Sequence, residues 1–180
     1  DVFAHTEAKI FASALENGGI INAMNAKGAA ARFSRKDLDK LQDFVKIYGA
    51  KALANLKYTD NEWSGSIAKM LSDEEKASLT EALGIENGDI VFVIADKKKV
   101  AQTALGALRS KLGKDLGLID ESKYNFLWVT NFPMFEYSEE EGRYVAAHHP
   151  FTSPNLEDLD KLLTDKGNCY SRAYDLVLNG

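Results

Sequence analysis

The sequence lacks the features of a membrane or secreted protein. Its single cysteine, Cys169, excludes an internal disulfide. The longest uninterrupted apolar run, Ile90 to Ala95, is far shorter than the roughly 18 residues that a membrane-spanning helix needs. The first residues, Asp1 to Thr6, do not show the basic and then apolar pattern of a signal peptide. These absences predict a protein of the cytoplasm.

The usual motifs of enzyme chemistry are also missing. We find no glycine-rich phosphate loop, no paired-cysteine metal site and no nucleophile elbow. The sequence does contain enough apolar material for a packed core, since Leu, Ile, Val and Phe supply 46 of its 180 residues. That length suits one large domain or two small ones. Because the sequence starts at Asp1 and stops at Gly180, within an expected strand and its turn, we expect a piece of a larger protein.

Charge is distributed unevenly along the chain. The 22 basic and 27 acidic residues give a net charge of −5, which is not typical of a nucleic-acid-binding protein. Residues 27–57 nevertheless carry +5 and residues 92–118 carry +4, whereas residues 58–91 and 119–180 carry −6 each. The two basic segments are consistent either with a phosphate-facing surface or with ordinary solvated helix faces.

Four segments have the spacing of amphipathic helices. They are residues 6–17, 34–48, 72–83 and 96–112. Ser34 and Ser72 each stand three residues before an acidic residue, which is the spacing of a capping box at a helix start. We expect Asp96 to cap the fourth helix and Gly113 to end it.

Short strands are predicted between and after these helices. They are residues 20–24, 52–58, 90–95, 126–129, 134–137, 143–149 and 173–179. The apolar run 90–95 indicates a central strand, and the polar turn at 138–142 indicates a β-hairpin. A short amphipathic helix is predicted across 156–163. The chain is therefore predicted to be α+β, with a two-layer unit of helices on a mainly antiparallel sheet and a β-rich remainder beginning near 118–124.

Three consecutive lysines, Lys97, Lys98 and Lys99, occupy the first turn of the fourth predicted helix. Cations at the positive end of a helix dipole are unfavourable by a few tenths of a kcal/mol each at an exposed site. Local helix energetics therefore do not explain them. They are consistent with a phosphate contact, or with a solubilising surface on which Asp96 offsets their charge.

Two of the three histidines, His148 and His149, are adjacent at the end of a predicted strand. Neighbouring strand residues point to opposite faces, so a shared zinc ion is disfavoured. One ring could face a pocket and bind an anionic ligand while the other packs, or both could be structural. Asp175 is predicted to face away from the apolar row of the last strand, where it could coordinate Mg²⁺ with another oxygen ligand.

Three strings of sequence closely resemble bacterial-type aspartyl-tRNA synthetases, which belong to class II. They are Phe126-Leu127-Trp128-Val129-Thr130-Asn131-Phe132-Pro133-Met134-Phe135-Glu136, His148-His149-Pro150-Phe151-Thr152-Ser153-Pro154 and Arg172-Ala173-Tyr174-Asp175-Leu176-Val177-Leu178-Asn179-Gly180. The upstream residues resemble the insertion (GAD) domain that these synthetases carry inside their catalytic domain. The resemblance implies a lead-in helix over 1–19, the insertion domain over 20–121 and part of the antiparallel catalytic sheet over 122–180.

The resemblance also implies roles for individual residues. In the family, the enzyme activates L-aspartate with ATP and Mg²⁺ and transfers it to aspartate-specific tRNA as a homodimer. His148 first, and His149 second, match positions beside the bound aspartate. Asp175 matches a position that helps hold Mg²⁺, together with a glutamate expected beyond Gly180. Because that glutamate and the ATP-binding arginines of the family lie outside the 180 residues, we expect this piece alone to be inactive.

The basic segments are our hypothesis for contact with the tRNA backbone. The residues concerned are Lys97, Lys98, Lys99, Arg109, Lys111 and Lys114. Two alternatives remain open. One is a free-standing RNA-binding or tRNA-amidotransferase-associated domain, although an amidotransferase insertion should lack the last two strings. The other is a small ligand- or metal-binding protein built around His148 and His149.

Overall fold

The computed structural model describes residues 2–180, and the chain divides into two compact units, one ending at Ile119 and one running from Asp120 to Gly180. Each unit is described by itself. The domain limits 1–19, 20–121 and 122–180 stay a prediction. No helix within residues 2–180 is both long enough and apolar enough to cross a membrane.

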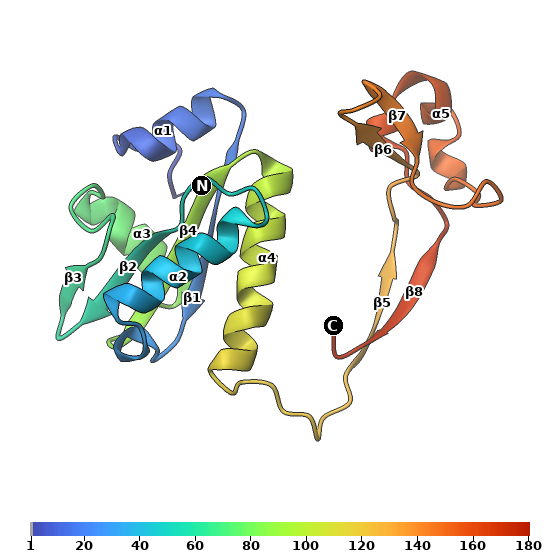
Figure 1. Ribbon diagram of the computed structural model, residues 1–180. Helices are drawn as coiled ribbons and strands as arrows, with labels where there is room; N and C mark the ends of the chain where they lie inside the picture. Colours follow the sequence, from blue (N-terminus) through green and yellow to red (C-terminus); the bar gives the residue numbers. More distant parts are fainter. Residues whose placement is uncertain (1) are drawn as a thin grey trace. The chain divides into compact units, whose positions relative to one another are not determined.

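The first unit contains one antiparallel sheet (Figure 1). Its strands are β1 (Ile20–Ala26), β2 (Ala54–Thr59), β3 (Glu62–Ser64) and β4 (Asp89–Asp96), in the order β1-β4-β2-β3. Val93 of the central strand β4 pairs with Ala23 on one side and Ala54 on the other. The sequence did not predict β3, which a two-residue turn makes possible: Asp60 and Asn61 have φ of 52° and 61°, as a tight hairpin turn requires.

Four α-helices and a short 3₁₀ turn surround this sheet. They are α1 (Lys9–Glu16), η1 (Ala30–Arg32), α2 (Arg35–Lys46), α3 (Asp73–Leu83) and α4 (Lys98–Asp115). Both capping boxes are confirmed, at Ser34 and at Ser72. The expected cap at Asp96 is wrong. The N-cap of α4 is Lys97, whose ammonium has no acceptor atom and makes no side-chain cap. Asp96 lies one residue before the N-cap, and one of its oxygens accepts from the adjacent Lys97 N–H at 2.8 Å. The helix also continues through Gly113.

Helices cover both faces of the sheet. Phe92 and its neighbours two residues away on β4 pack with α2 and α4, whereas Val91 and Val93 pack with α1 and α3. The α+β class and the antiparallel pairing are confirmed. The predicted unit has two layers, helices on one face of a sheet, whereas the structure has helices on both faces. The physical reason lies in the strand itself: residues 90–94 are all buried, so side chains on both of its faces need an apolar partner.

The second unit consists of two separate two-stranded sheets and short helical turns (Figure 1). Its elements are β5 (Phe126–Thr130), β6 (Phe135–Ser138), β7 (Arg143–Ala146), η2 (Leu156–Asp158), α5 (Lys161–Thr164), η3 (Lys166–Asn168) and β8 (Tyr174–Leu178). The predicted hairpin is confirmed as β6–β7, and β5 pairs with β8. The single helix predicted across 156–163 is instead divided between η2 and α5.

Candidate functional site

Three loop segments of the second unit cross at one point and are tied by backbone hydrogen bonds. Ser171 donates its N–H to the Phe132 carbonyl at 2.7 Å, and its Oγ lies 3.1 Å from the same oxygen. Arg172 donates its N–H to the Ser153 carbonyl at 2.9 Å. Ser171 is fully buried. The crossing therefore fixes the segment after β5, the segment after the histidine pair and the segment before β8 relative to one another.

A buried carboxylate anchors the neighbouring turn. Asp158 accepts a hydrogen bond from the Tyr170 N–H at 2.9 Å and forms an ion pair with Lys161. The Lys161 hydrogen bond and then the Tyr170 N–H lower the pKa of Asp158. Burial raises the pKa of the nearby Cys169 thiol, which keeps it protonated at neutral pH. Cys169 is therefore part of the packing at this turn and does not have the character of a nucleophile.

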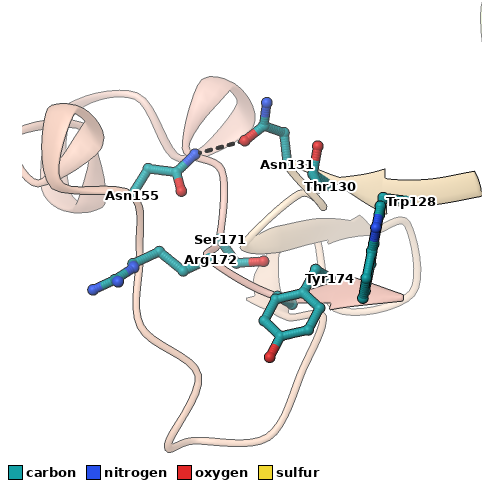
Figure 2. Close-up of a pocket in the computed structure, with 8 residues that line it drawn as sticks. Trp128, Thr130, Asn131, Asn155, Ser171, Arg172 and Tyr174 are labelled. Atoms are coloured by element: carbon teal, nitrogen blue, oxygen red, sulfur yellow. Dashed lines mark hydrogen bonds between the residues drawn. The ribbon is translucent and has the colours of Figure 1, made fainter. Parts of the chain in front are cut away.

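A cavity of about 520 Å³ lies beside the crossing (Figure 2). On one side, the Asn155 amide donates to the Asn131 side-chain oxygen at 3.1 Å. On the other, the rings of Trp128 and Tyr174 meet edge to face, with centroids 5.6 Å apart. Thr130, Ser171, Arg172 and Ala173 complete the lining. The arrangement offers amide and guanidinium donors next to an aromatic surface.

The two predicted histidines differ in their environments. His148 is half-buried, and its ring packs edge-on against Phe132 with centroids 5.6 Å apart. His149 is exposed, and its Nδ1 accepts from the Phe151 N–H at 3.2 Å. Neither histidine lines the cavity of Figure 2. Within residues 2–180, no three or more His, Cys, Asp or Glu side chains are placed to hold a metal ion.

Asp175 lies on the face of the β5–β8 ladder opposite the cavity. It pairs with Val129, whereas Trp128 pairs with Leu176, so the two pairs point to opposite faces. This agrees with the alternation predicted from the sequence. The Asp175 carboxylate is exposed and forms no ion pair among residues 2–180. It is chemically suited to supply one oxygen ligand to a cation such as Mg²⁺.

The crossing connects the histidine pair to the Asp175 strand. His148 packs on Phe132, the Phe132 carbonyl is bound by Ser171, and Ser171 precedes Asp175 by four residues. The structure thus ties the predicted amino-acid-binding and metal-binding residues to one hydrogen-bonded framework, while leaving both outside the cavity.

The predicted basic residues lie in the first unit, along α4 and just before it. Lys98 and Lys114 are 16 residues apart, which corresponds to about 24 Å of helix. Lys97, Lys98, Lys99, Arg109 and Lys114 are exposed. Lys111 is not free, because its Nζ lies 2.8 Å from Asp115 and 5.5 Å from the ring centroid of Phe44.

The sequence did not single out the residues that line the cavity. Trp128 and Arg172 belong to the strings that resemble the synthetases, but no pattern in the sequence indicates a role for either residue. Asn131 has a φ of 56°, a conformation that asparagine tolerates better than most residues. A single asparagine in the sequence does not indicate that its backbone is left-handed or that its side chain lines a cavity. Its hydrogen-bond partner Asn155 is 24 residues away.

Comparison with known proteins identifies relatives of the whole chain. The family model described as "GAD domain" matches residues 11–105. An aspartate–tRNA ligase of Halalkalibacterium halodurans is 55% identical over all 180 residues, and one of Oceanobacillus iheyensis is 54% identical over the same span. An aspartate–tRNA(Asp/Asn) ligase of Anoxybacillus flavithermus is 55% identical over 172 residues, or 96% of the chain. The chain spans about 30% of the length of these relatives.

Proposed function

Because this chain belongs to the GAD domain family, we propose that it is part of an aspartate–tRNA ligase that activates aspartate with ATP and esterifies aspartate-specific tRNA. The observation that carries the proposal is the identity of 54–55% to ligases over 96–100% of the chain. The relatives support this function and not the free-standing RNA-binding or amidotransferase-associated alternative.

His148 is proposed to contact the bound aspartate, with His149 as the second candidate. Distinguishing aspartate from asparagine requires a positive charge near the side-chain carboxylate, and a protonated imidazole can supply one. The half-buried ring of His148, held against Phe132, supports this order of preference, because a packed ring presents its nitrogens in one direction. The exposed His149 is instead bonded through Nδ1 to its own loop.

Asp175 is proposed to help hold Mg²⁺ on the phosphates of ATP. An exposed carboxylate without an ion-pair partner, on a strand tied to the His148 loop, fits an oxygen ligand for this cation. When bound, Mg²⁺ neutralises part of the phosphate charge. Asp175 itself contributes a fixed anionic oxygen on the face of the ladder that Val129 shares.

The remaining proposals concern partners and location. Lys97, Lys98, Lys99, Arg109 and Lys114 are proposed to contact the tRNA backbone, with Lys111 contributing less because of its pairing to Asp115. The complete enzyme is proposed to be a homodimer of the cytoplasm.

The test uses the product of the complete gene that contains these residues. We expect aspartate-dependent exchange of pyrophosphate into ATP and charging of aspartate tRNA. We also expect a His148→Ala variant to raise the KM for aspartate more than it raises the KM for ATP. As a matched control, His5→Ala removes a histidine of the first unit and should change neither constant. Absence of aspartate-dependent exchange in the complete wild-type protein contradicts the proposal.

A further inference from the structure

The two faces of the sheet in the first unit carry opposite charge. Residues 27–57 and 96–117, which include η1, α2 and α4, hold 14 basic and 5 acidic residues. The other described residues of this unit, which include α1 and α3, hold 3 basic and 10 acidic residues. Because α2 and α4 pack on one face of the sheet and α1 and α3 on the other, the basic and acidic segments of the sequence lie on opposite sides of the unit.

Most acidic residues on the basic side are already engaged. Asp37, Asp43 and Asp115 each form an ion pair with a lysine of the same helix, at 3.5, 2.8 and 2.8 Å. Asp96 accepts a hydrogen bond from the backbone N–H of Lys97. The remaining basic side chains therefore have few carboxylates to neutralise them, and a polyanion is the partner that complements such a surface.

Besides the lysine triplet Lys97, Lys98 and Lys99, a second group of unneutralised cations lies where η1 leads into α2. Arg32, Arg35 and Lys36 are exposed, and none forms an ion pair among residues 2–180. Arg32 lines a cleft of about 330 Å³ that Lys40 and Lys111 also line. Asp37 and Asp115 stand in the same cleft and pair with Lys40 and Lys111, so Arg32 is the cation of the cleft that forms no ion pair and can attract an anion.

Helix energetics do not account for Arg35 and Lys36. They occupy the first two positions of α2, at the positive end of the helix dipole, where cations are slightly unfavourable. The capping box of Ser34 and Asp37 already satisfies the helix start. Two cations at this unfavourable position point to an interaction outside the unit.

We propose that Arg32, Arg35 and Lys36 bind the phosphate backbone of the tRNA. The polyanion follows from the charge of this face, and its identity as tRNA rests on the proposed function. This site is separate from the lysine triplet before and at the start of α4, since Lys98 and Lys111 are 13 residues apart and α4 therefore places about 20 Å between the triplet and the cleft.

The experiment measures binding of aspartate tRNA to the complete protein at several salt concentrations. The variant is Arg35→Gln with Lys36→Gln, which removes cations from the positive end of a helix and should fold normally. The matched control is Lys9→Gln with Lys69→Gln, two exposed lysines of the other side with no ion pair among residues 2–180. Both double variants change the net charge equally.

We expect the Arg35/Lys36 variant to raise the Kd about tenfold at low salt and to reduce the slope of log K against log salt by about 2, one for each lost phosphate contact. The control should keep the wild-type slope. Adding Arg32→Gln should lower the slope further. If the wild-type protein charges tRNA while the variant and the control bind it equally well, the inference is rejected and the proposed function stands. If the wild-type protein neither charges nor binds tRNA, the proposed function itself is rejected.

Discussion

The two units are stabilised by different means. In the first, residues 90–94 of the central strand are at most 1% exposed, because helices cover both faces of the sheet. In the second, Phe126, Trp128 and Tyr174 are 64%, 61% and 67% exposed although they lie on paired strands. The first unit thus completes its own apolar core, whereas the second retains apolar strand faces that it does not cover.

Polar contacts take a larger part in ordering the second unit. Its fully or nearly buried side chains are Ser171, at the crossing of three segments, and Asp158 and Cys169, at the neighbouring turn. The charge differs as well, since residues 1–119 hold 17 basic and 16 acidic residues, and residues 120–180 hold 5 and 11. We therefore expect core substitutions to be most damaging in the first unit, and polar substitutions at the crossing to be most damaging in the second.

The largest effect is expected from Phe92→Ala. Phe92 is fully buried, with its ring edge-on to Phe33 at 5.6 Å, so its truncation should lower the unfolding free energy of the first unit by about 3–5 kcal/mol. Each unit contains one tryptophan, Trp63 or Trp128, which allows the units to be followed separately by fluorescence in urea. In a Trp128→Phe background, Trp63 reports on the first unit, and Phe92→Ala should lower the urea midpoint of its fluorescence. In a Trp63→Phe background, Trp128 reports on the second unit, and its urea midpoint should not change. An equal fall of that midpoint would show that the two units unfold together.

A smaller effect is expected from Asp89→Asn. The Asp89 carboxylate is 2% exposed and accepts from Asn25 Nδ2, the Gly28 N–H and the Glu86 N–H at 2.8, 2.7 and 2.9 Å. An amide cannot accept all three bonds, and it brings its own NH₂ group toward these donors. The unfolding free energy of the first unit, measured in urea, should therefore fall by about 1–3 kcal/mol.

The same carboxylate predicts a pH dependence. Burial alone would raise the pKa of Asp89, but the bonds from Asn25, Glu86 and Gly28 and the charge of Lys27 outweigh it and hold the pKa below the ordinary value of 3.8. A depressed pKa stabilises the folded state above pH 3.8, and this contribution is lost as the pH falls through the folded pKa. Urea titrations between pH 3 and pH 7 should show a steeper acid loss in the wild type than in Asp89→Asn. Equal slopes would contradict this assignment.

Asp158→Asn makes the corresponding test in the second unit. It removes the ion pair with Lys161 while keeping the side-chain shape. We expect a smaller loss than for Asp89→Asn, because Lys161 is 40% exposed and water can replace part of the interaction. The Trp128 fluorescence midpoint should fall slightly, and the Trp63 midpoint should not change. A loss of unfolding free energy larger than that of Asp89→Asn would show that the second unit depends more on the Asp158 carboxylate than the first unit depends on Asp89.

The sequence predicted local features of the fold well. Ser34 and Ser72 were correctly placed at helix starts, because capping depends on residues three positions apart. Asp96 does not cap α4, because its side chain accepts from the N–H of the next residue, Lys97, which precedes the helix. The second helical layer was missed although residues 90–95 are all apolar, because the meaning of such a run depends on which elements lie against it.

The candidate site was less predictable than the fold. The adjacency of His148 and His149 in the sequence indicates a candidate site. Their different surroundings depend on ring contacts with Phe132 and Phe151, which only the folded structure shows. The cavity joins Asn131, Asn155 and Arg172 from three segments far apart in sequence. Long-range hydrogen bonds of this kind leave no periodic pattern, so no reading of spacing could assemble them.

The smallest effect is expected from Trp128→Ala, although tryptophan has the largest side chain. Trp128 is 61% exposed, and its main ring contact is the edge-to-face pair with Tyr174, which contributes about 0.5–1.5 kcal/mol beyond burial in well-packed sites. At such exposure we expect a loss near the lower end of that range. Because the variant lacks the Trp128 signal, tyrosine fluorescence or circular dichroism must follow its unfolding in urea. A loss comparable to that of Phe92→Ala would mean that the β5–β8 ladder is held by its aromatic face and not by the polar crossing.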